Sequence, residues 1–196
     1  IVKKRAQLMQ NAVPEGKGAM AAILGLSDSE VVNICHELQT NGVVEAVNFN
    51  SPGQVVVAGD KIAIEASLEV FKSAGAKRAI ILPVSVPSHC SLMKSAANEF
   101  GEFLKPIDFR DPKFPVIQNY EAIAYDNVDK IKEGLFYQMF NPVKWTQSIE
   151  FISVNKIDTY LEIGPGKVLT SLGRRINKDL DFVSIDSIDS IDYLNK

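Results

Sequence analysis

The order of apolar and amphipathic segments over residues 17–85 limits the possible folds of this chain more than any other feature. Four apolar runs have the length and residue types of strands, at 18–25, 43–50, 54–59 and 79–84. Residues 28–39, after the first run, and 61–73, after the third, place apolar residues at helical spacing. The resulting order, β-α-β-β-α-β, is typical of a ferredoxin-like split βαβ unit. We therefore predict a ferredoxin-like subdomain over residues 15–85.

Polar residues and glycines set the predicted ends of these segments. Asp28 is the predicted N-cap of the first helix, because its carboxylate can accept hydrogen bonds from the free N–H groups of the first turn. Gly42 and Gly75 are the predicted helix stops, since glycine adopts the left-handed conformation that commonly ends a helix. Residues 51–53 form the predicted turn between the middle two strands.

The remaining sequence alternates helical and extended patterns, which predicts an α/β layered arrangement. Helices are predicted at 92–104, 128–140, 145–154 and 167–176, and strands at 114–118, 159–163 and 182–185. The chain starts at Ile1, inside a helical pattern, so we expect it to be a piece of a longer protein. We assign residues 1–14 and 86–196 to a second, larger subdomain of the α/β class.

Composition excludes several classes of protein. The 196 residues are 46% hydrophobic and 23% charged, which is ordinary for a globular chain and too apolar for dominant disorder. A net charge of −3 argues against nucleic acid as a partner, and no apolar run approaches the roughly 18 residues of a membrane span. Cys35 and Cys90 are the only cysteines, and no signal-like apolar segment opens the chain, so we predict reduced thiols and a cytoplasmic location.

His89, in the sequence Ser85-Val-Pro-Ser-His-Cys90 after a predicted strand, is the main catalytic candidate. Loops at strand ends commonly carry catalytic groups, and a pKa of about 6.5 suits a histidine to general base catalysis at neutral pH. A partly exposed loop histidine without function is an equally good interpretation of the local sequence. Cys90 is not its nucleophile, because adjacent residues of an extended segment point to opposite faces. Two histidines and two cysteines also make no metal site.

No serine nucleophile is visible in the sequence. Such a serine in an α/β enzyme usually occupies a Gly-x-Ser-x-Gly turn, because little beyond glycine fits beside it. The three Ser-x-Gly fragments, at Ser51, Ser73 and Ser171, all lack the first glycine.

Two polar motifs remain. The sequence Gly164-Pro-Gly-Lys167 is followed by Val168 where a phosphate-binding loop needs serine or threonine, so we interpret it as a tight turn. Asn48 and Asn50 are two positions apart on a predicted strand and would share one face. They could contact a ligand there or cap the hairpin.

Six longer motifs stand in order along the chain. They are Arg5-Ala-Gln-Leu-Met-Gln10, Gly18-Ala-Met-Ala-Ala22, Val47-Asn-Phe-Asn-Ser-Pro-Gly-Gln-Val55, Pro83-Val-Ser-Val-Pro-Ser-His-Cys90, Asn141-Pro-Val-Lys-Trp145 and Glu162-Ile-Gly-Pro-Gly-Lys-Val-Leu169. Together they resemble the malonyl-CoA:acyl carrier protein transacylases of bacterial type II fatty acid synthesis. The resemblance implies an α/β fold in which a ferredoxin-like subdomain is joined to the C-terminal part of an α/β-hydrolase-like acyltransferase domain.

The resemblance also implies a ping-pong transfer, in which a serine takes malonyl from malonyl-CoA and passes it to the phosphopantetheine thiol of acyl carrier protein. His89 matches the general base, and Arg5 matches the arginine that binds the malonyl carboxylate. Gln138 matches the position whose backbone carbonyl orients the histidine. Three further positions match residues that line the cleft between the subdomains: Met9, Asn48 and Asn50. No cofactor or metal is implied, since the partner carries the phosphopantetheine.

Two parts of the family pattern are absent from this sequence. The serine turn Gly-His-Ser-Leu-Gly lies shortly upstream of the family's arginine, and a glutamine-containing loop nearer the N-terminus helps to form the oxyanion hole. We therefore expect the C-terminal part of the enzyme, inactive on its own. The alternative is a non-catalytic module that binds acyl carrier protein. A serine turn encoded before Ile1 would favour the enzyme.

Acyl carrier proteins are strongly acidic, so a local cluster of cations is expected to attract one to this slightly acidic chain. Lys77 and Arg78 are the predicted contacts, because they open the fourth strand, which leads towards His89; Lys72 could extend the cluster. The alternative is a solvated pair of cations at a strand entrance. We expect a cytoplasmic protein, monomeric at full length, that binds malonyl-CoA and acyl carrier protein and neither nucleic acid nor membrane.

Overall fold

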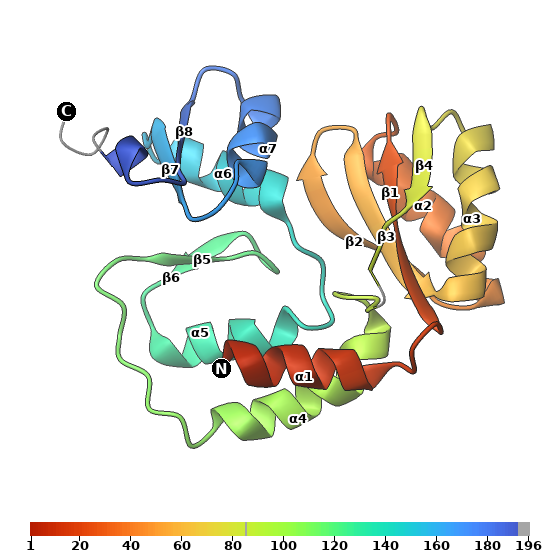
Figure 1. The fold of residues 1–196 in the computed structure, drawn as a ribbon, viewed down its shortest axis with the longest axis horizontal. Coiled ribbons are helices and arrows are strands. Elements are labelled where there is room, and N and C mark those ends of the chain that lie inside the picture. Colours follow the sequence, from red (N-terminus) through yellow and green to blue (C-terminus); the bar gives the residue numbers. More distant parts are fainter. Residues whose placement is uncertain (85, 192–196) are drawn as a thin grey trace.

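The computed structural model describes residues 1–84 and 86–191, which fold into two bodies joined side by side (Figure 1). Residue 85, the predicted end of the ferredoxin-like subdomain, lies outside the described residues. So do the last five residues of the predicted 86–196 segment.

The first body is a four-stranded antiparallel sheet with two helices on one face (Figure 1). Its elements are β1 (Gly18–Leu24), α2 (Asp28–Leu38), the short helix η1 (Gln39–Asn41), β2 (Val44–Ser51), β3 (Gln54–Asp60), α3 (Lys61–Ser73) and β4 (Arg78–Ile81). The strands lie in the order β2-β3-β1-β4, with every neighbouring pair antiparallel. This is the ferredoxin-like arrangement that the element order predicts.

The two faces of this sheet have different partners, because successive side chains of a strand point to opposite sides. Ala21 of β1 and Val57 of β3 belong to the core that the sheet forms with α2 and α3. Met20 and Val56 point the other way and pack against Cys90. The second face of the sheet is therefore covered by the chain that follows β4.

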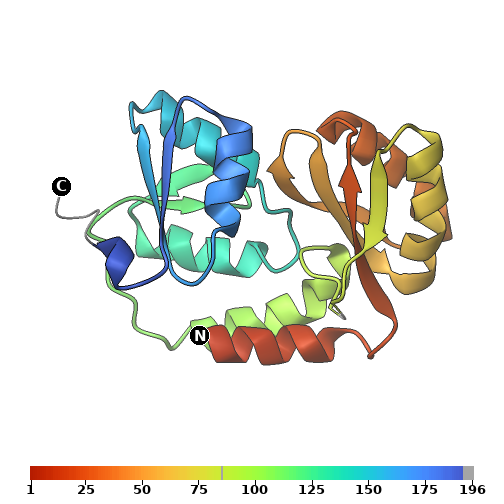
Figure 2. The ribbon, with the colours of Figure 1, turned by 45° about the horizontal axis from the view of Figure 1, so that its top comes forward.

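The second body contains the N-terminal helix and the elements that follow β4 (Figure 2). Its elements are α1 (Val2–Ala12), η2 (Ser91–Met93), α4 (Lys94–Leu104), β5 (Val116–Gln118), β6 (Ile123–Tyr125), α5 (Val128–Tyr137), α6 (Trp145–Val154), β7 (Thr159–Ile163), α7 (Val168–Ile176) and β8 (Asp181–Ile185). Helices α1 and α4 lie side by side in both views. Leu8 of α1, Phe100 of α4 and Met139 after α5 share one buried cluster, which fixes α1 beside the C-terminal half of the chain.

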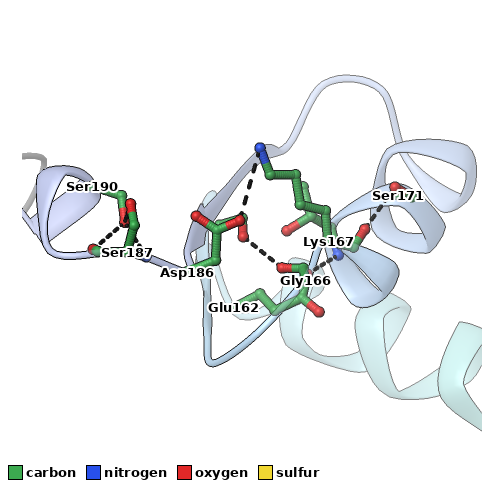
Figure 3. A network of polar contacts seen from close by, with 9 residues as sticks. Glu162, Gly166, Lys167, Ser171, Asp186, Ser187 and Ser190 are labelled. Carbon is green, nitrogen blue, oxygen red and sulfur yellow. Dashed lines mark hydrogen bonds and ion pairs between the residues drawn. The ribbon is translucent and has the colours of Figure 1, made fainter.

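The turn between β7 and α7 is closed by polar contacts (Figure 3). The Glu162 carboxylate accepts hydrogen bonds from the backbone N–H groups of Leu169, at 3.0 Å, and Thr170, at 2.7 Å. Burial raises the pKa of Glu162, but these bonds outweigh it and leave the pKa below the ordinary value. A carboxylate of the chain itself thus occupies the N-terminus of α7, where a phosphate-binding loop would hold its ligand. The geometry agrees with the tight-turn interpretation.

Several predicted boundaries change. The N-cap of α2 is Ser27 and not Asp28: Ser27 Oγ accepts from the Glu30 N–H at 3.3 Å, while the Glu30 carboxylate accepts from the Ser27 N–H at 2.7 Å. This reciprocal pair is a capping box, which needs glutamate three residues after the cap. Strand β4 ends at Ile81, ahead of Pro83, which has no N–H to pair. The three-residue strand β6 was not predicted, and α5 ends three residues early.

We expect Ser27→Ala to lower the free energy of unfolding by about 1 kcal/mol, since it leaves an N–H of the first turn of α2 without its acceptor. Asp28→Ala is the matched control, because it keeps the capping box and removes only a favourable charge near the helix N-terminus. It should lower the free energy of unfolding by about 0.3–1 kcal/mol. Urea unfolding measures both. If Asp28→Ala lowers the free energy of unfolding more than Ser27→Ala does, Asp28 is the N-cap.

Candidate active site

His89 lies in residues 86–91, the histidine segment, which follows β4 and ends at Ser91, the first residue of η2. Its backbone φ is 67°, in the left-handed region that residues other than glycine rarely adopt. Such a conformation costs about 1–3 kcal/mol and persists only where the surrounding structure holds it. The contacts on either side of His89 are therefore essential to the site.

The imidazole of His89 is held by a backbone carbonyl. Its Nδ1 lies 2.7 Å from the carbonyl oxygen of Gln138. A carbonyl can only accept, so Nδ1 carries the proton and Nε2 keeps the lone pair. Burial lowers the pKa of His89, the bond to Gln138 opposes this, and the positive charge of Arg5 lowers it further. The net pKa is below 6.5, so the ring is neutral at pH 7 and Nε2 can accept a proton.

The accepting carbonyl is fixed by the turn that ends α5. The side-chain amide of Gln138 donates to the carbonyl of Asn141 at 2.9 Å and to that of Pro142 at 3.2 Å. The Asn141 amide donates back to the carbonyl of Tyr137 at 2.8 Å. The backbone N–H of Gln138 still donates to the Gly134 carbonyl of α5, at 2.9 Å, so the helix end and the side-chain bonds fix this residue together.

Arg5, on α1, brings an unpaired cation to the same region. The side chain is partly buried, and burial lowers the pKa of its guanidinium from the ordinary value. Among residues 1–84 and 86–191, no carboxylate forms an ion pair with it and no group accepts a hydrogen bond from its side chain. Its charge acts on His89. A desolvated guanidinium without a partner is suited to bind an anion, and its planar fork matches a carboxylate.

The three predicted cleft residues differ in exposure. Met9 is 7% exposed and packs in the cluster around α1 and α4, whereas Asn48 and Asn50 are partly exposed on β2. The pairing of β2 with β3 shifts register twice, between Ala46 and Asn48 and between Phe49 and Ser51. A shared face for the two asparagines therefore does not follow from their spacing.

Both thiols are in apolar surroundings. Cys90 is fully buried and its Sγ donates to the carbonyl of Pro87 at 3.1 Å. Burial, above all, raises the pKa of Cys90 to about 12 and that of Cys35 to about 12. The thiolate is the reactive form, so neither cysteine is activated as a nucleophile. Within the described part of the chain, no cluster of three or more His, Cys, Asp or Glu residues could hold a metal ion.

Two sets of contacts at the histidine segment were not anticipated. The Glu45 carboxylate accepts from the backbone N–H of Ser91 at 2.9 Å and from its hydroxyl at 2.5 Å. Pro87 is fully buried against Gly18, where an added Cβ would lie 2.4 Å from the proline ring. An acidic residue inside the apolar run 43–47 was the available signal for Glu45, since a half-buried carboxylate needs a donor.

Lys77 and Arg78 lie at the other end of β1 from this segment. Arg78 pairs with Leu24, and the Lys77 N–H donates to the Leu24 carbonyl at 2.8 Å, whereas Pro87 packs on Gly18. Both cations are exposed. Lys72 is paired with Glu69 at 2.7 Å.

Comparison with known proteins gives a consistent set of relatives. The chain is 50% identical over 176 residues to a malonyl CoA-acyl carrier protein transacylase of Escherichia coli, and 44% identical over its whole length to one of Haemophilus influenzae. Among solved structures, it matches an acyl carrier protein S-malonyltransferase of Vibrio cholerae with a TM-score of 0.96 and 48% identity, over 98% of this chain and 63% of that one.

A second structure, with a TM-score of 0.96 and 45% identity, is a malonyl-transacylase in complex with a type II PKS acyl-carrier protein; the match covers all of this chain and 64% of that one. No protein-family model matches. The two curated relatives are matched over 90% and 100% of this chain, but over only 57% and 63% of their own length. The chain thus spans about three fifths of the length of these relatives. No helix within residues 1–84 and 86–191 has the length and apolarity to cross a membrane.

The lowered pKa of His89 predicts a pH dependence of stability. Between the pKa of the folded protein and about 6.5, the unfolded histidine binds a proton that the folded one does not. Lowering the pH through this window should therefore reduce the free energy of unfolding, with no effect from His89 above it. Urea unfolding of the chain and of His89→Asn at several pH values tests this. A difference between the two that does not change between pH 7 and pH 5 would contradict it.

Proposed function

We infer that this chain, which belongs to the malonyl CoA-acyl carrier protein transacylase family, supplies the general base and the carboxylate-binding arginine of an S-malonyltransferase. The observation that carries this is the bond from His89 Nδ1 to the Gln138 carbonyl, together with the unpaired Arg5 close by. The proposed reaction moves malonyl from malonyl-CoA to the phosphopantetheine thiol of acyl carrier protein. It makes the protein a cytoplasmic enzyme of fatty acid synthesis.

The proposed role of His89 is proton transfer in both halves of the reaction. Nε2 takes the proton of a serine hydroxyl as the oxygen attacks the malonyl thioester, and returns it to the departing CoA sulfur as the C–S bond breaks. The same nitrogen then takes the proton of the phosphopantetheine thiol as the sulfur attacks the serine ester, and returns it to the serine oxygen as the ester C–O bond breaks. A neutral ring at pH 7, with its proton fixed on Nδ1, supports this role.

The proposed role of Arg5 is to bind the free carboxylate of the malonyl group. A partly buried guanidinium can form two parallel hydrogen bonds to a carboxylate. An acetyl group has no carboxylate and cannot accept this pair of bonds. The effect of its charge on His89 supports a position for the bound acyl group beside the base. Met9, Asn48 and Asn50 are proposed to line the remainder of the cleft.

The proposed contact for acyl carrier protein is the end of the sheet that carries Lys77 and Arg78. Arg175 of α7 donates to the side chain of Gln54 at 2.8 Å, and Gln54 and Arg78 both pair with Leu24 on opposite sides of β1. Cations from both bodies therefore gather at one end of this sheet. Such a cluster attracts an acidic partner although the chain as a whole is slightly acidic.

The 196-residue chain should show no malonyl transfer, because it contains no Gly-x-Ser-x-Gly turn to supply the nucleophile. In a full-length protein that contains this chain, His89→Ala should lower the rate by about 10²- to 10⁴-fold, the usual contribution of a general base. A radiolabelled malonyl transfer assay measures both. Transfer by the isolated chain, or a near-normal rate for the variant, would contradict the assignment.

Arg5→Ala in the full-length protein should reduce malonyl transfer by about 10- to 100-fold, the cost of losing a charged hydrogen-bond partner. Transfer from acetyl-CoA should fall much less, because acetyl has no carboxylate to bind. Competition between the two CoA esters measures the ratio. An equal loss for both would give Arg5 a structural role.

Reversing both charges, Lys77→Glu with Arg78→Glu, should slow transfer to acyl carrier protein by about tenfold at low ionic strength and less at high salt. Loading of malonyl from malonyl-CoA should stay nearly normal. Lys105→Glu with Lys113→Glu, on the second body, is a control with the same change in net charge. Equal loss in both half-reactions would indicate damage to the fold, and no loss in either would place the contact elsewhere.

A further inference from the structure

We propose that Glu45 is a positioning residue for His89: its carboxylate fixes the histidine segment on strand β2, so that the imidazole meets the Gln138 carbonyl. The catalytic meaning of this role rests on the proposed function. The structural role does not, and it can be measured without any activity.

Strand β2 carries Glu45 on the second face of the sheet. Glu45 pairs with Ala58 of β3, and Ala58 belongs to the cluster that packs against Cys90 on the second face of the sheet. The Glu45 side chain therefore lies on the side where the histidine segment crosses. Both carboxylate oxygens are used there, one by the N–H of Ser91 at 2.9 Å and one by its hydroxyl at 2.5 Å. Hydrogen bonds to a charged acceptor are the stronger kind.

Strand β2 also holds the segment that carries the acceptor of the His89 hydrogen bond. The Phe49 N–H donates to the Val143 carbonyl at 2.9 Å, and the Val143 N–H donates to the Val47 carbonyl at 2.8 Å. Val143 follows the turn in which Gln138 is fixed. A single strand thus holds the chain just after His89, through a side chain, and the chain just after Gln138, through its backbone.

The left-handed backbone of His89 needs support on both sides. On the N-terminal side, Pro87 is wedged against Gly18 and accepts from the Cys90 thiol. On the C-terminal side, within residues 1–84 and 86–191, Glu45 is the only residue whose side chain forms hydrogen bonds with Ser91. The backbone bonds that begin η2, from the Met93 N–H to the Cys90 carbonyl and from the Lys94 N–H to the Ser91 carbonyl, join this side to the helix and not to the sheet. Removing the carboxylate would therefore free this end of the segment from β2 and let the ring leave the carbonyl.

The test is ¹⁵N NMR of the imidazole rings in the full 196-residue chain, which has only two histidines. In the unmodified chain we expect His89 to hold its proton on Nδ1, with slow exchange of that proton with water. Glu45→Gln removes one of two acceptor oxygens. We expect it to give a mixture of the two neutral tautomers and on the order of tenfold faster exchange. His36, on the exposed side of α2, supplies the reference signal.

Glu37→Gln, the same chemical change at an exposed position on α2, is the matched control and should leave His89 unchanged. Ser91→Ala removes only the hydroxyl contact, so it should change the His89 tautomer and exchange rate less than Glu45→Gln does. In the double variant, Glu45→Gln should change them less than it does alone, because both changes act on the same contact. If Glu45→Gln fails to fold, Ser91→Ala still decides: an unchanged tautomer and exchange rate would overturn the proposal.

A folded Glu45→Gln that is less stable but keeps the Nδ1 proton would also overturn it, since Glu45 would then be merely structural. The full-length protein separates the two proposals. If Glu45→Gln changes the tautomer while malonyl transfer stays normal, Glu45 positions His89 but His89 is not the base. If both change and Glu45→Asp restores both in part, both proposals are supported.

Discussion

The hydrogen bond between His89 and Gln138 joins two chain segments 49 residues apart, and its geometry depends on the pairing of β2 with the segment after α5. Only Gln138 is placed in part by its own local structure, since its N–H donates to the Gly134 carbonyl of α5. His89 has a left-handed backbone outside any helix or strand, and Gln138 lies where α5 ends. The edge of β2 is the rigid element that both segments share. This follows a general pattern in which catalytic groups on loops are positioned by a regular scaffold.

The element order and several boundaries were predictable because strong local signals mark them. The ranges predicted for α3, α6 and β7 agree with the structure. Glycine, proline or a clear change of periodicity stands at or near the ends of each. The N-cap of α2 was wrong because Ser27 and Asp28 are adjacent and both residue types cap well. The choice between them depends on Glu30, whose carboxylate completes the capping box only with Ser27.

The site was predictable to a smaller extent, for a physical reason. His89 is visible from its residue type and its place after a strand, but local chemistry alone left a loop histidine without function equally possible. Arg5 and Gln138 came from resemblance, since neither a single arginine in a helix nor a backbone carbonyl has a local sequence signature. The contacts of Glu45 with Ser91 bridge 46 residues, and those of Val143 with β2 are made by backbone atoms. Such contacts depend on tertiary packing, which the spacing of residues along the chain does not predict.

The two buried thiols make the chain its own reporter of local opening. Cys35 lies in the core between the sheet and its helices, while Cys90 lies on the opposite face, next to His89. With pKa values of about 12, both are protonated and shielded in the native state, so a thiol reagent labels each only when its surroundings open. The rate at Cys35 reports opening of the ferredoxin-like body. The labelling rate at Cys90 reports release of the histidine segment. If Cys90 is labelled faster than Cys35, the histidine segment opens while the ferredoxin-like body stays closed.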